Sequence, residues 1–309
     1  MITSVFRKST PLNYSIIIIG LVFVFFLYQI NHGTGSMSAV SILEKTAMLG
    51  VIFFSLFTAS FIIKKNGLSK DSSYTVLFFL LFLMFFPSVF ANFKLVLSNF
   101  FVLLGFRRLV SLQSLKATKE KIFDASLWVF VATLFHFWSI LFILLVFTAI
   151  LFHAAKDYRN WLLPFIAFFT IGTLFTMLTL IFDKPWITNL INESQINYKI
   201  DYFTNNYQNM ALSIYATMAL FFMTSLLMSI SSRPIILQAS YKKIVSAFVL
   251  GVGVFLMSSV KSNDLLIFTI APLAMMATTH IESAQIKWHR EVVLGAVIVI
   301  AIFLYFAQL

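Results

Sequence analysis

Residues 122–152 read IFDASLWVFVATLFHFWSILFILLVFTAILF, an apolar run with two titratable side chains, Asp124 and His136. One continuous helix of this length would measure about 46 Å, whereas the hydrocarbon core of a bilayer is about 30 Å thick. The run is too long for one membrane span and short for two. We interpret it as a hairpin of two short helices that turns near His136.

Residues 74–106 form a second run of this kind, about 50 Å long as a single helix. Its natural break lies at Pro87, Asn92 and Lys94, because proline stops a helix and polar groups favour a headgroup region or a cavity. We expect a second hairpin here. Asn92 and Asn99 are seven residues apart and would share a helix face that hydrogen-bonds to a neighbouring helix.

The remaining apolar runs have the lengths of ordinary spans. They cover residues 12–30, 47–63, 161–182, 210–230 and 292–309, with shorter runs at 244–260 and 265–279 that form a further hairpin. Arg7 and Lys8 precede the first run as in a signal peptide, but no small-residue cleavage site follows, so we expect an uncleaved span. Apolar residues make up 60% of the chain and charged residues 11%. This composition excludes a water-soluble globule.

The distribution of Lys and Arg decides how the long runs are counted, because basic residues collect on the cytoplasmic side. With both runs as hairpins and a cytoplasmic N-terminus, the chain has about 11 spans. All but five of the 22 Lys and Arg residues are then cytoplasmic; the five outside are Lys45, Lys94, Lys184, Lys199 and Lys261. Treating residues 122–152 as one span would instead move the basic loops at 156–159, 233–243 and 287–290 outside.

The outer side is neutral in this arrangement, since Glu44, Asp183, Glu193, Asp201 and Asp264 balance its five lysines. The net charge of +11 therefore belongs to the cytoplasmic side, which faces anionic lipid. We predict an all-α polytopic transmembrane bundle with the N-terminus inside and the C-terminus outside. It forms a single transmembrane domain over residues 1–309 in a bacterial inner membrane.

The loop at residues 183–209, DKPWITNLINESQINYKIDYFTNNYQN, is too polar to span a membrane. We expect an extracytoplasmic loop with a short interfacial helix. Its acids Asp183, Glu193 and Asp201, beside Trp and Tyr, have the composition of a carbohydrate-facing surface. The same composition is typical of an aromatic belt at a membrane interface.

Lys261 and Asp264 are three residues apart, and on a helix they would be neighbours that offset each other's desolvation. At the outer headgroups such a pair is ordinary. Drawn inward it becomes a candidate functional site, because a charge at the centre of a span costs roughly 2.5–3.5 kcal/mol. Four acids are thus the candidates for a catalytic site: Asp183, Glu193, Asp201 and Asp264.

Arg107 and Arg108 begin the strongest basic segment. Two guanidinium groups suit a lipid phosphate or an acidic partner, and Lys261 is a third candidate for this contact. The alternative is a topology anchor. Asp124 begins the next helix, where it would pair with Arg107 or Arg108 or act as a general base on a cytosolic substrate.

Several site classes have no support in the sequence. The chain has no cysteine, its five histidines lack metal-ligand spacing, and its 10 glycines form no phosphate-binding loop. We expect no cofactor and no metal site. Its basic residues are scattered among apolar runs, so we expect no nucleic-acid partner.

Several segments resemble an uncharacterised family of polytopic inner-membrane proteins from Bacteroidota: FRKSTPLN at 6–13, KNGLS at 65–69, RRLVSL at 107–112, KIFDA at 121–125 and PLA at 272–274. The resemblance covers nearly the whole chain and implies an inner-membrane location and a helical fold. Some relatives carry the automatic description beta-carotene monooxygenase, but these histidines do not form the iron site that this chemistry requires. The alternation of full and short helices distantly resembles membrane glycosyltransferases and glycan polymerases that use polyprenyl-linked sugars.

Two functional hypotheses follow. In the first, the protein handles a lipid-linked glycan or a lipid carrier in cell-envelope biogenesis, with the outer loop and the Lys261/Asp264 hairpin facing the substrate. In the second, it is a non-catalytic membrane subunit that scaffolds a cell-envelope or secretion complex. A transporter is third, because the scarcity of charges within the spans disfavours ion coupling. The expected partners are membrane lipids with a polyprenyl-linked substrate or other membrane subunits, and catalysis stays open.

Overall fold

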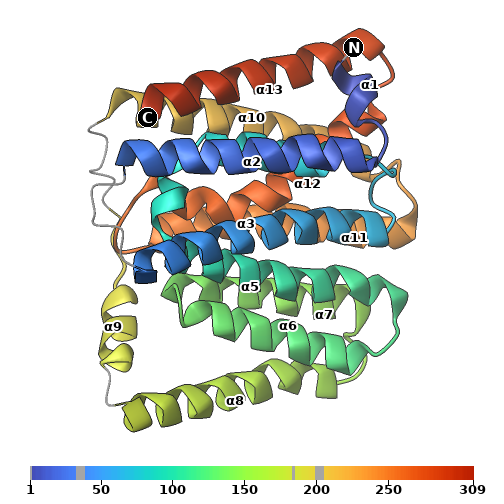
Figure 1. Ribbon diagram of the computed structural model, residues 1–309. Helices are drawn as coiled ribbons and strands as arrows, with labels where there is room; N and C mark the ends of the chain where they lie inside the picture. Colours follow the sequence, from blue (N-terminus) through green and yellow to red (C-terminus); the bar gives the residue numbers. More distant parts are fainter. Residues whose placement is uncertain (1, 33–38, 183–184, 199–204) are drawn as a thin grey trace.

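The computed structural model of the chain describes residues 2–32, 39–182, 185–198 and 205–309. These residues form a bundle of helices that lie side by side, with no strand among them (Figure 1). The α-helices are α1 (Ile2–Phe6), α2 (Pro11–His32), α3 (Ala39–Lys65), α4 (Tyr74–Met84), α5 (Phe93–Val110), α6 (Thr118–Thr133), α7 (Ile143–His153), α8 (Arg159–Phe182), α9 (Trp186–Glu193), α10 (Asn206–Ile230), α11 (Ile235–Met257), α12 (Ile267–Ser283) and α13 (Lys287–Gln308). Four 3-10 helices connect them: η1 (Pro87–Ala91), η2 (Ser111–Ser114), η3 (Phe137–Phe142) and η4 (Asn263–Leu266).

Among the described residues, eight helical segments are long and apolar enough to cross a membrane. They are Pro11–His32, Ala39–Lys65, Phe93–Ser114, Arg159–Phe182, Asn206–Ile230, Ile235–Met257, Asn263–Ser283 and Lys287–Gln308. Two shorter apolar segments, Tyr74–Met84 and Phe137–His153, accompany them. The chain is therefore an all-α membrane protein.

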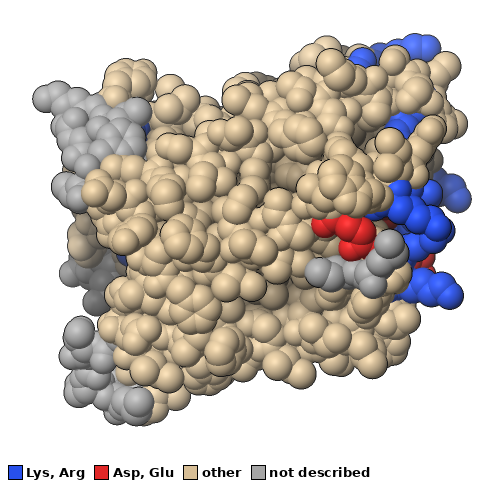
Figure 2. Space-filling view, turned by 90° about the horizontal axis from the view of Figure 1, so that it is seen from above, with Lys and Arg blue, Asp and Glu red and all other residues tan. Residues whose placement is uncertain are grey.

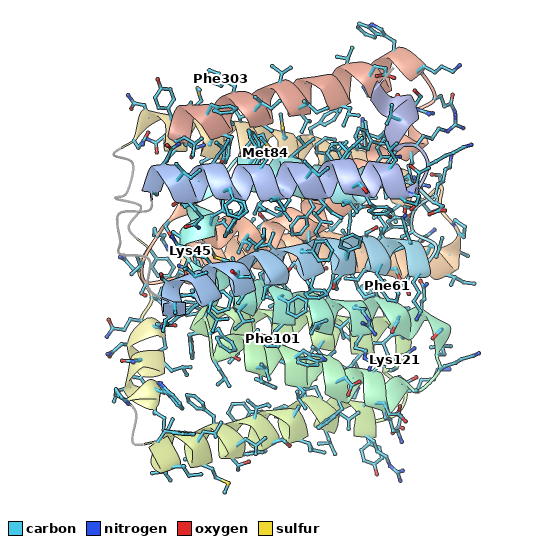
Figure 3. All side chains as sticks on the ribbon, viewed as in Figure 1. Lys45, Phe61, Met84, Phe101, Lys121 and Phe303 are labelled. Atoms are coloured by element: carbon cyan, nitrogen blue, oxygen red, sulfur yellow. The ribbon has the colours of Figure 1, made fainter. Side chains whose placement is uncertain are left out.

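The core of the bundle lies around α4 and α12. Every residue of α4 is buried, as is 94% of the most apolar stretch of the η4–α12 segment. At the periphery, α8 buries only 17% of its apolar stretch and lies along one edge in Figure 1. Large apolar side chains such as Phe303, which points away from α13 in Figure 3, cover the outer surface.

Lys and Arg side chains gather at the end of the bundle that holds α1, here called the basic end (Figure 2). Hydrogen bonds join the helix termini there: Ser72 Oγ donates to Glu282 at 2.6 Å, and Lys243 Nζ donates to the Leu109 carbonyl at 2.7 Å. At the opposite end, the amide of Gln29 donates to the Phe90 carbonyl at 2.9 Å. Polar contacts thus mark both ends of an apolar middle.

The two predicted breaks in the long apolar runs are confirmed, and so is the break between the short runs at 244–260 and 265–279. Between α4 and α5 the chain forms η1, which begins at Pro87, and Asn92 caps α5 by accepting from the backbone N–H of Leu95 at 3.3 Å. The run at residues 122–152 turns between the end of α6 and the start of η3, around His136, and η3 and α7 pack back against α6. Residues 258–262 form the third break, between α11 and η4.

Candidate functional site

The three breaks meet at the opposite end of the bundle, where η1 packs against η4 and α9 packs against η3. Helix α4 has 11 residues, about 16 Å, against 22 residues in α2, so the chain breaks at η1 after a short helix. Non-helical backbone at membrane depth is tolerated only where it is buried in protein or lines a cavity. The opposite end is therefore the natural place for a polar site.

A cavity of about 180 Å³ lies between these elements. Its walls come from the η1–α5 junction, the turn after α6, the end of α9 and the segment after α11. The lining residues are Asn92, Lys94, Leu95, Phe135, His136, Glu193, Ser258, Ser259, Val260, Ser262 and Leu265. The cavity thus gathers one base, one acid and one histidine from distant parts of the chain, and we call it the Glu193 cavity.

His136 lies in the turn after α6, with Nε2 at 3.0 Å from Ser258 Oγ. The Ser258 hydroxyl donates its single proton to the Val254 carbonyl at 2.9 Å. His136 Nε2 must then be the donor to Ser258, which leaves Nδ1 as an unprotonated acceptor. Burial lowers the pKa of His136 to about 4, so the ring is neutral at pH 7.

Asp264 lies beside the Glu193 cavity and is 7% exposed. Its carboxylate accepts hydrogen bonds from Asn92 Nδ2 at 3.1 Å and from Ser262 Oγ, and both donors line the cavity. The next residue toward the N-terminus, Asn263, donates to the Gln208 carbonyl at 3.0 Å and ties η4 to α10. Asp264 therefore holds two cavity side chains in place.

Lys261 does not hydrogen-bond to Asp264, which differs from the expectation for a helical pair. Its ammonium donates to the carbonyls of Phe255 at 3.2 Å and Ser258 at 3.1 Å, at the end of α11. The last carbonyls of a helix lack helical partners and carry partial negative charge, so a lysine suits them. The spacing was misleading because residues 258–262 are not helical.

The other predicted site residues are scattered. Glu193 ends α9 and lines the cavity, whereas Asp183 and Asp201 lie outside the described residues. At the basic end, Arg108 Nη2 lies 2.9 Å from Asp124 Oδ2, which confirms the predicted pairing. The Arg107 guanidinium lies 5.1 Å from the centre of the Phe61 ring. A catalytic role for the acids and a phosphate contact for the arginines stay predictions.

Sequence reasoning placed His136 at a turn and Lys94 at a break without assigning either to a site. One feature of the sequence could have indicated a shared site: the break near Lys94 and the turn at His136 fall at the same end of neighbouring hairpins. The expected partner for Asn92 is found in η4, but no described residue hydrogen-bonds to the buried amide nitrogen of Asn99. In the described part of the chain, no three His, Asp or Glu side chains are grouped as metal ligands.

Residues 8–309 match a family whose description is "Family of unknown function (DUF6427)". No curated protein and no solved structure matches the chain. The match covers nearly all of the sequence, so the chain belongs to this family, which agrees with the resemblance to an uncharacterised family.

Proposed function

We propose that this protein binds the headgroup of a lipid-linked glycan in the Glu193 cavity, as part of cell-envelope biogenesis in a bacterial inner membrane. One observation supports it above all. Lys94 at the start of α5, His136 in the turn after α6 and Glu193 at the end of α9 line one cavity of a bundle whose middle is apolar. Ionisable groups are rare in such bundles and mark substrate sites.

The chemistry of the lining suits a phosphorylated sugar. The Lys94 ammonium is a cation for a carrier phosphate, while Glu193 and His136 Nδ1 accept hydrogen bonds from hydroxyl groups. At about 180 Å³ the cavity is smaller than the roughly 300–1,000 Å³ of drug-sized sites. It therefore fits one end group of a glycan and leaves the lipid chain in the bilayer.

A binding measurement tests this proposal. The purified protein in lipid nanodiscs is titrated with a polyprenyl diphosphate sugar and the complex is counted by native mass spectrometry. We expect Glu193→Gln and His136→Gln to weaken binding about 10-fold, because hydrogen bonds to charged groups contribute about 1.5–3 kcal/mol. Glu44→Gln, at an exposed carboxylate of the same end, is the control. Equal binding by the wild type and all three variants would refute the proposal.

The topology that goes with this function has eleven spans, the basic end in the cytoplasm and the Glu193 cavity outside. It is supported by the collection of Lys and Arg at one end (Figure 2). The chain has no cysteine, so single cysteines report cleanly. We expect Ala117→Cys and Lys287→Cys to be labelled only after permeabilisation, and Gln195→Cys to be labelled in intact cells. The reverse pattern contradicts the orientation.

The alternative is a non-catalytic subunit that scaffolds an envelope or secretion complex. It is favoured by α8, which contacts the bundle mainly through α6 and buries 17% of its apolar stretch. An apolar hollow on α8 is lined by Phe168, Phe169, Gly172, Thr173, Thr176 and Met177. Purification in a mild detergent distinguishes the two hypotheses: a stoichiometric partner that α8 substitutions remove supports the subunit, and the chain alone counts against it.

A further inference from the structure

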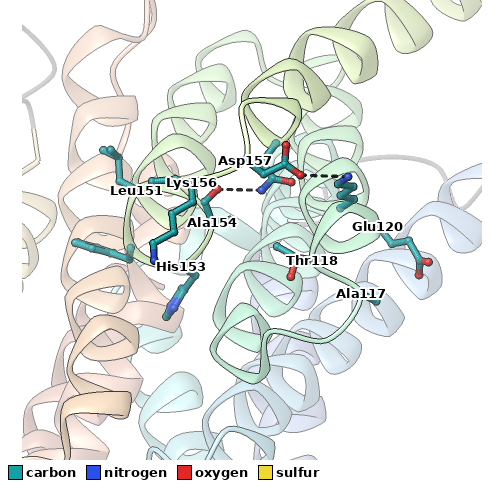
Figure 4. A pocket seen from close by; sticks show the side chains of 12 residues that line it. Ala117, Thr118, Glu120, Leu151, His153, Ala154, Lys156 and Asp157 are labelled. Atoms are coloured by element: carbon teal, nitrogen blue, oxygen red, sulfur yellow. Dashed lines mark hydrogen bonds and ion pairs between the residues drawn. The ribbon is translucent and has the colours of Figure 1, made fainter.

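A larger cavity, about 720 Å³, lies at the basic end between the start of α6, the end of α7 and the start of α8 (Figure 4). Its charged and polar lining includes Lys119, Glu120, His153, Lys156, Asp157 and Asn160. It shares no residue with the Glu193 cavity, which is at the other end of the bundle. We call it the His153 cavity.

Lys243 lies behind the wall of this cavity and is fully buried. Its Nζ donates to the Leu109 carbonyl at 2.7 Å and lies 3.1 Å from His153 Nε2. In its charged form Lys243 has only donors, so Nε2 then accepts and the ring proton of His153 is on Nδ1. His153 therefore offers an N–H donor on a ring that lines the cavity.

The charges around the His153 cavity favour an anion. The two acceptors of the Lys243 ammonium are both neutral, and a buried charge without a counter-ion is costly. Lys156, which lines the same cavity, points toward His153 in Figure 4. The Asp157 carboxylate is already engaged by Lys119 Nζ at 3.2 Å and by the backbone N–H of Arg159 at 3.0 Å. Glu120 also lines the cavity and is exposed, so the lining holds two lysines and two acids. The excess positive charge is that of the Lys243 ammonium behind the wall, which an anion that contacts Lys156 and His153 would balance.

Asn160 gives an independent indication of the ligand. It is 5% exposed, and its Nδ2 donates to the Ala154 carbonyl at 2.9 Å. No described residue hydrogen-bonds to its buried Oδ1, although buried acceptors in folded proteins are nearly always paired. Because Oδ1 can only accept, a ligand that contacts it supplies a hydrogen-bond donor as well as an anion.

We propose that the His153 cavity binds a phosphate ester that carries a free hydroxyl group, such as a glycerol phosphate. The phosphate oxygens accept from Lys156 Nζ and His153 Nδ1, and the hydroxyl donates to Asn160 Oδ1. This chemistry is shared by the headgroup of phosphatidylglycerol and by soluble phosphate esters. The site does not depend on the function proposed for the Glu193 cavity.

The test uses the full chain in phosphatidylcholine nanodiscs, titrated calorimetrically with glycerol 3-phosphate and with inorganic phosphate. We expect the wild type to bind glycerol 3-phosphate about 3- to 10-fold more tightly, the contribution of one hydrogen bond from a hydroxyl. Asn160→Leu removes this preference, and Lys156→Gln weakens both ligands about 10-fold. Lys116→Gln, at an exposed lysine outside the lining, binds as the wild type does.

A second arm uses phosphatidylglycerol in the nanodisc and native mass spectrometry of the released protein. Retained phosphatidylglycerol that Lys156→Gln removes and Lys116→Gln does not identifies the lipid as the source. Binding of the soluble ester alone identifies a cytosolic ligand, and either result supports the proposal. Binding of neither probe, equal binding of the ester and inorganic phosphate, or equal effects of the two lysine substitutions would overturn it. Lys156 is exposed, so its variant folds even if Asn160→Leu does not.

Discussion

Helices α11 and α12 approach each other closely at Gly251, and this contact yields a quantitative prediction. A Cβ atom added at Gly251 would lie 2.9 Å from Thr269 Cγ2 and 3.0 Å from the backbone carbon and oxygen of Phe268. Non-bonded carbon atoms prefer 3.5–4.0 Å, so the helices must separate by about 0.5 Å. Helix α12 has little freedom to move, because Phe268 and Thr269 are buried and the helix also packs against α4 and α10.

The expected cost of Gly251→Ala is the overpacking of a tight core, about 1–3 kcal/mol. Alanine also favours a helix over glycine by up to about 1 kcal/mol, which would mask part of that cost. Gly172→Ala in α8 isolates this second contribution, because no atom beyond the adjacent residues and the backbone of its own helix lies within 4 Å of the added Cβ. We expect Gly172→Ala to be neutral or stabilising, and Gly251→Ala to be less stable than Gly172→Ala by about 1–3 kcal/mol.

Reversible unfolding in mixed micelles, followed by tryptophan fluorescence and circular dichroism, gives the free energy of unfolding of each variant. Because α11 leads into Ser258 and η4 precedes α12, separation of these helices also displaces the wall of the Glu193 cavity. Equal free energies of unfolding for Gly251→Ala and Gly172→Ala would refute the close approach. A loss of stability in both variants would show that the helices require glycine at these positions for a reason other than the close contact between α11 and α12.

Three further predictions concern buried polar groups. Asn92→Leu should lower the unfolding free energy by about 1.5–3 kcal/mol, because it leaves the Asp264 carboxylate without its amide donor. In an Asp264→Asn background the same substitution should cost less, and a double-mutant cycle measures the difference. The unfolding free energy should be insensitive to His136 well above pH 6.5, where the ring is neutral in both states. Between pH 6.5 and 4 the protonation of His136 in the unfolded state should lower the unfolding free energy by up to about 2–3 kcal/mol. His136→Gln should remove this contribution and leave those of the other partly buried histidines. Tyr215→Phe removes the 2.7 Å hydrogen bond with Thr269 Oγ1 and should cost about 1 kcal/mol in thermal or denaturant unfolding, whereas Tyr207→Phe, at an exposed ring, should cost nothing measurable.

The breaks in the long apolar runs could be predicted because they depend only on the length of each run compared with the thickness of a bilayer. A bilayer sets the number of residues in a span, so residues 74–106 and 122–152 had to be interrupted, and Pro87 and His136 mark where. The packing order could not be predicted in this way. Lipid is as apolar as a protein core, so the composition of α8 and α12 does not reveal that α12 is central and α8 peripheral.

The candidate site was harder to predict, because its members are far apart in sequence. Lys261 and Asp264 are conspicuous neighbours in the chain, yet one caps α11 and the other accepts from Asn92. Lys94, His136 and Glu193 have no common period or spacing, and they meet only because η1, η3 and α9 lie at one end. The decisive information is which breaks are adjacent in space, and this depends on the order of helix packing.

The division of residues 122–152 into two arms supplies histidines to both cavities. The second arm consists of η3 and α7. His136 precedes it at one end of the bundle, and His153 ends it at the other, about 25 Å away along the helix. Both rings bond to α11 or its end, His136 to Ser258 and His153 to Lys243. In a single long helix, His136 would lie in mid-span, away from the break that carries Ser258, and its ring nitrogens would be costly to bury there without partners. The turn therefore gives His136 Nε2 a hydrogen-bond partner and places the ring in the lining of the Glu193 cavity. Residues 122–152 are too long for one span, and the break that this length requires also creates a place for binding.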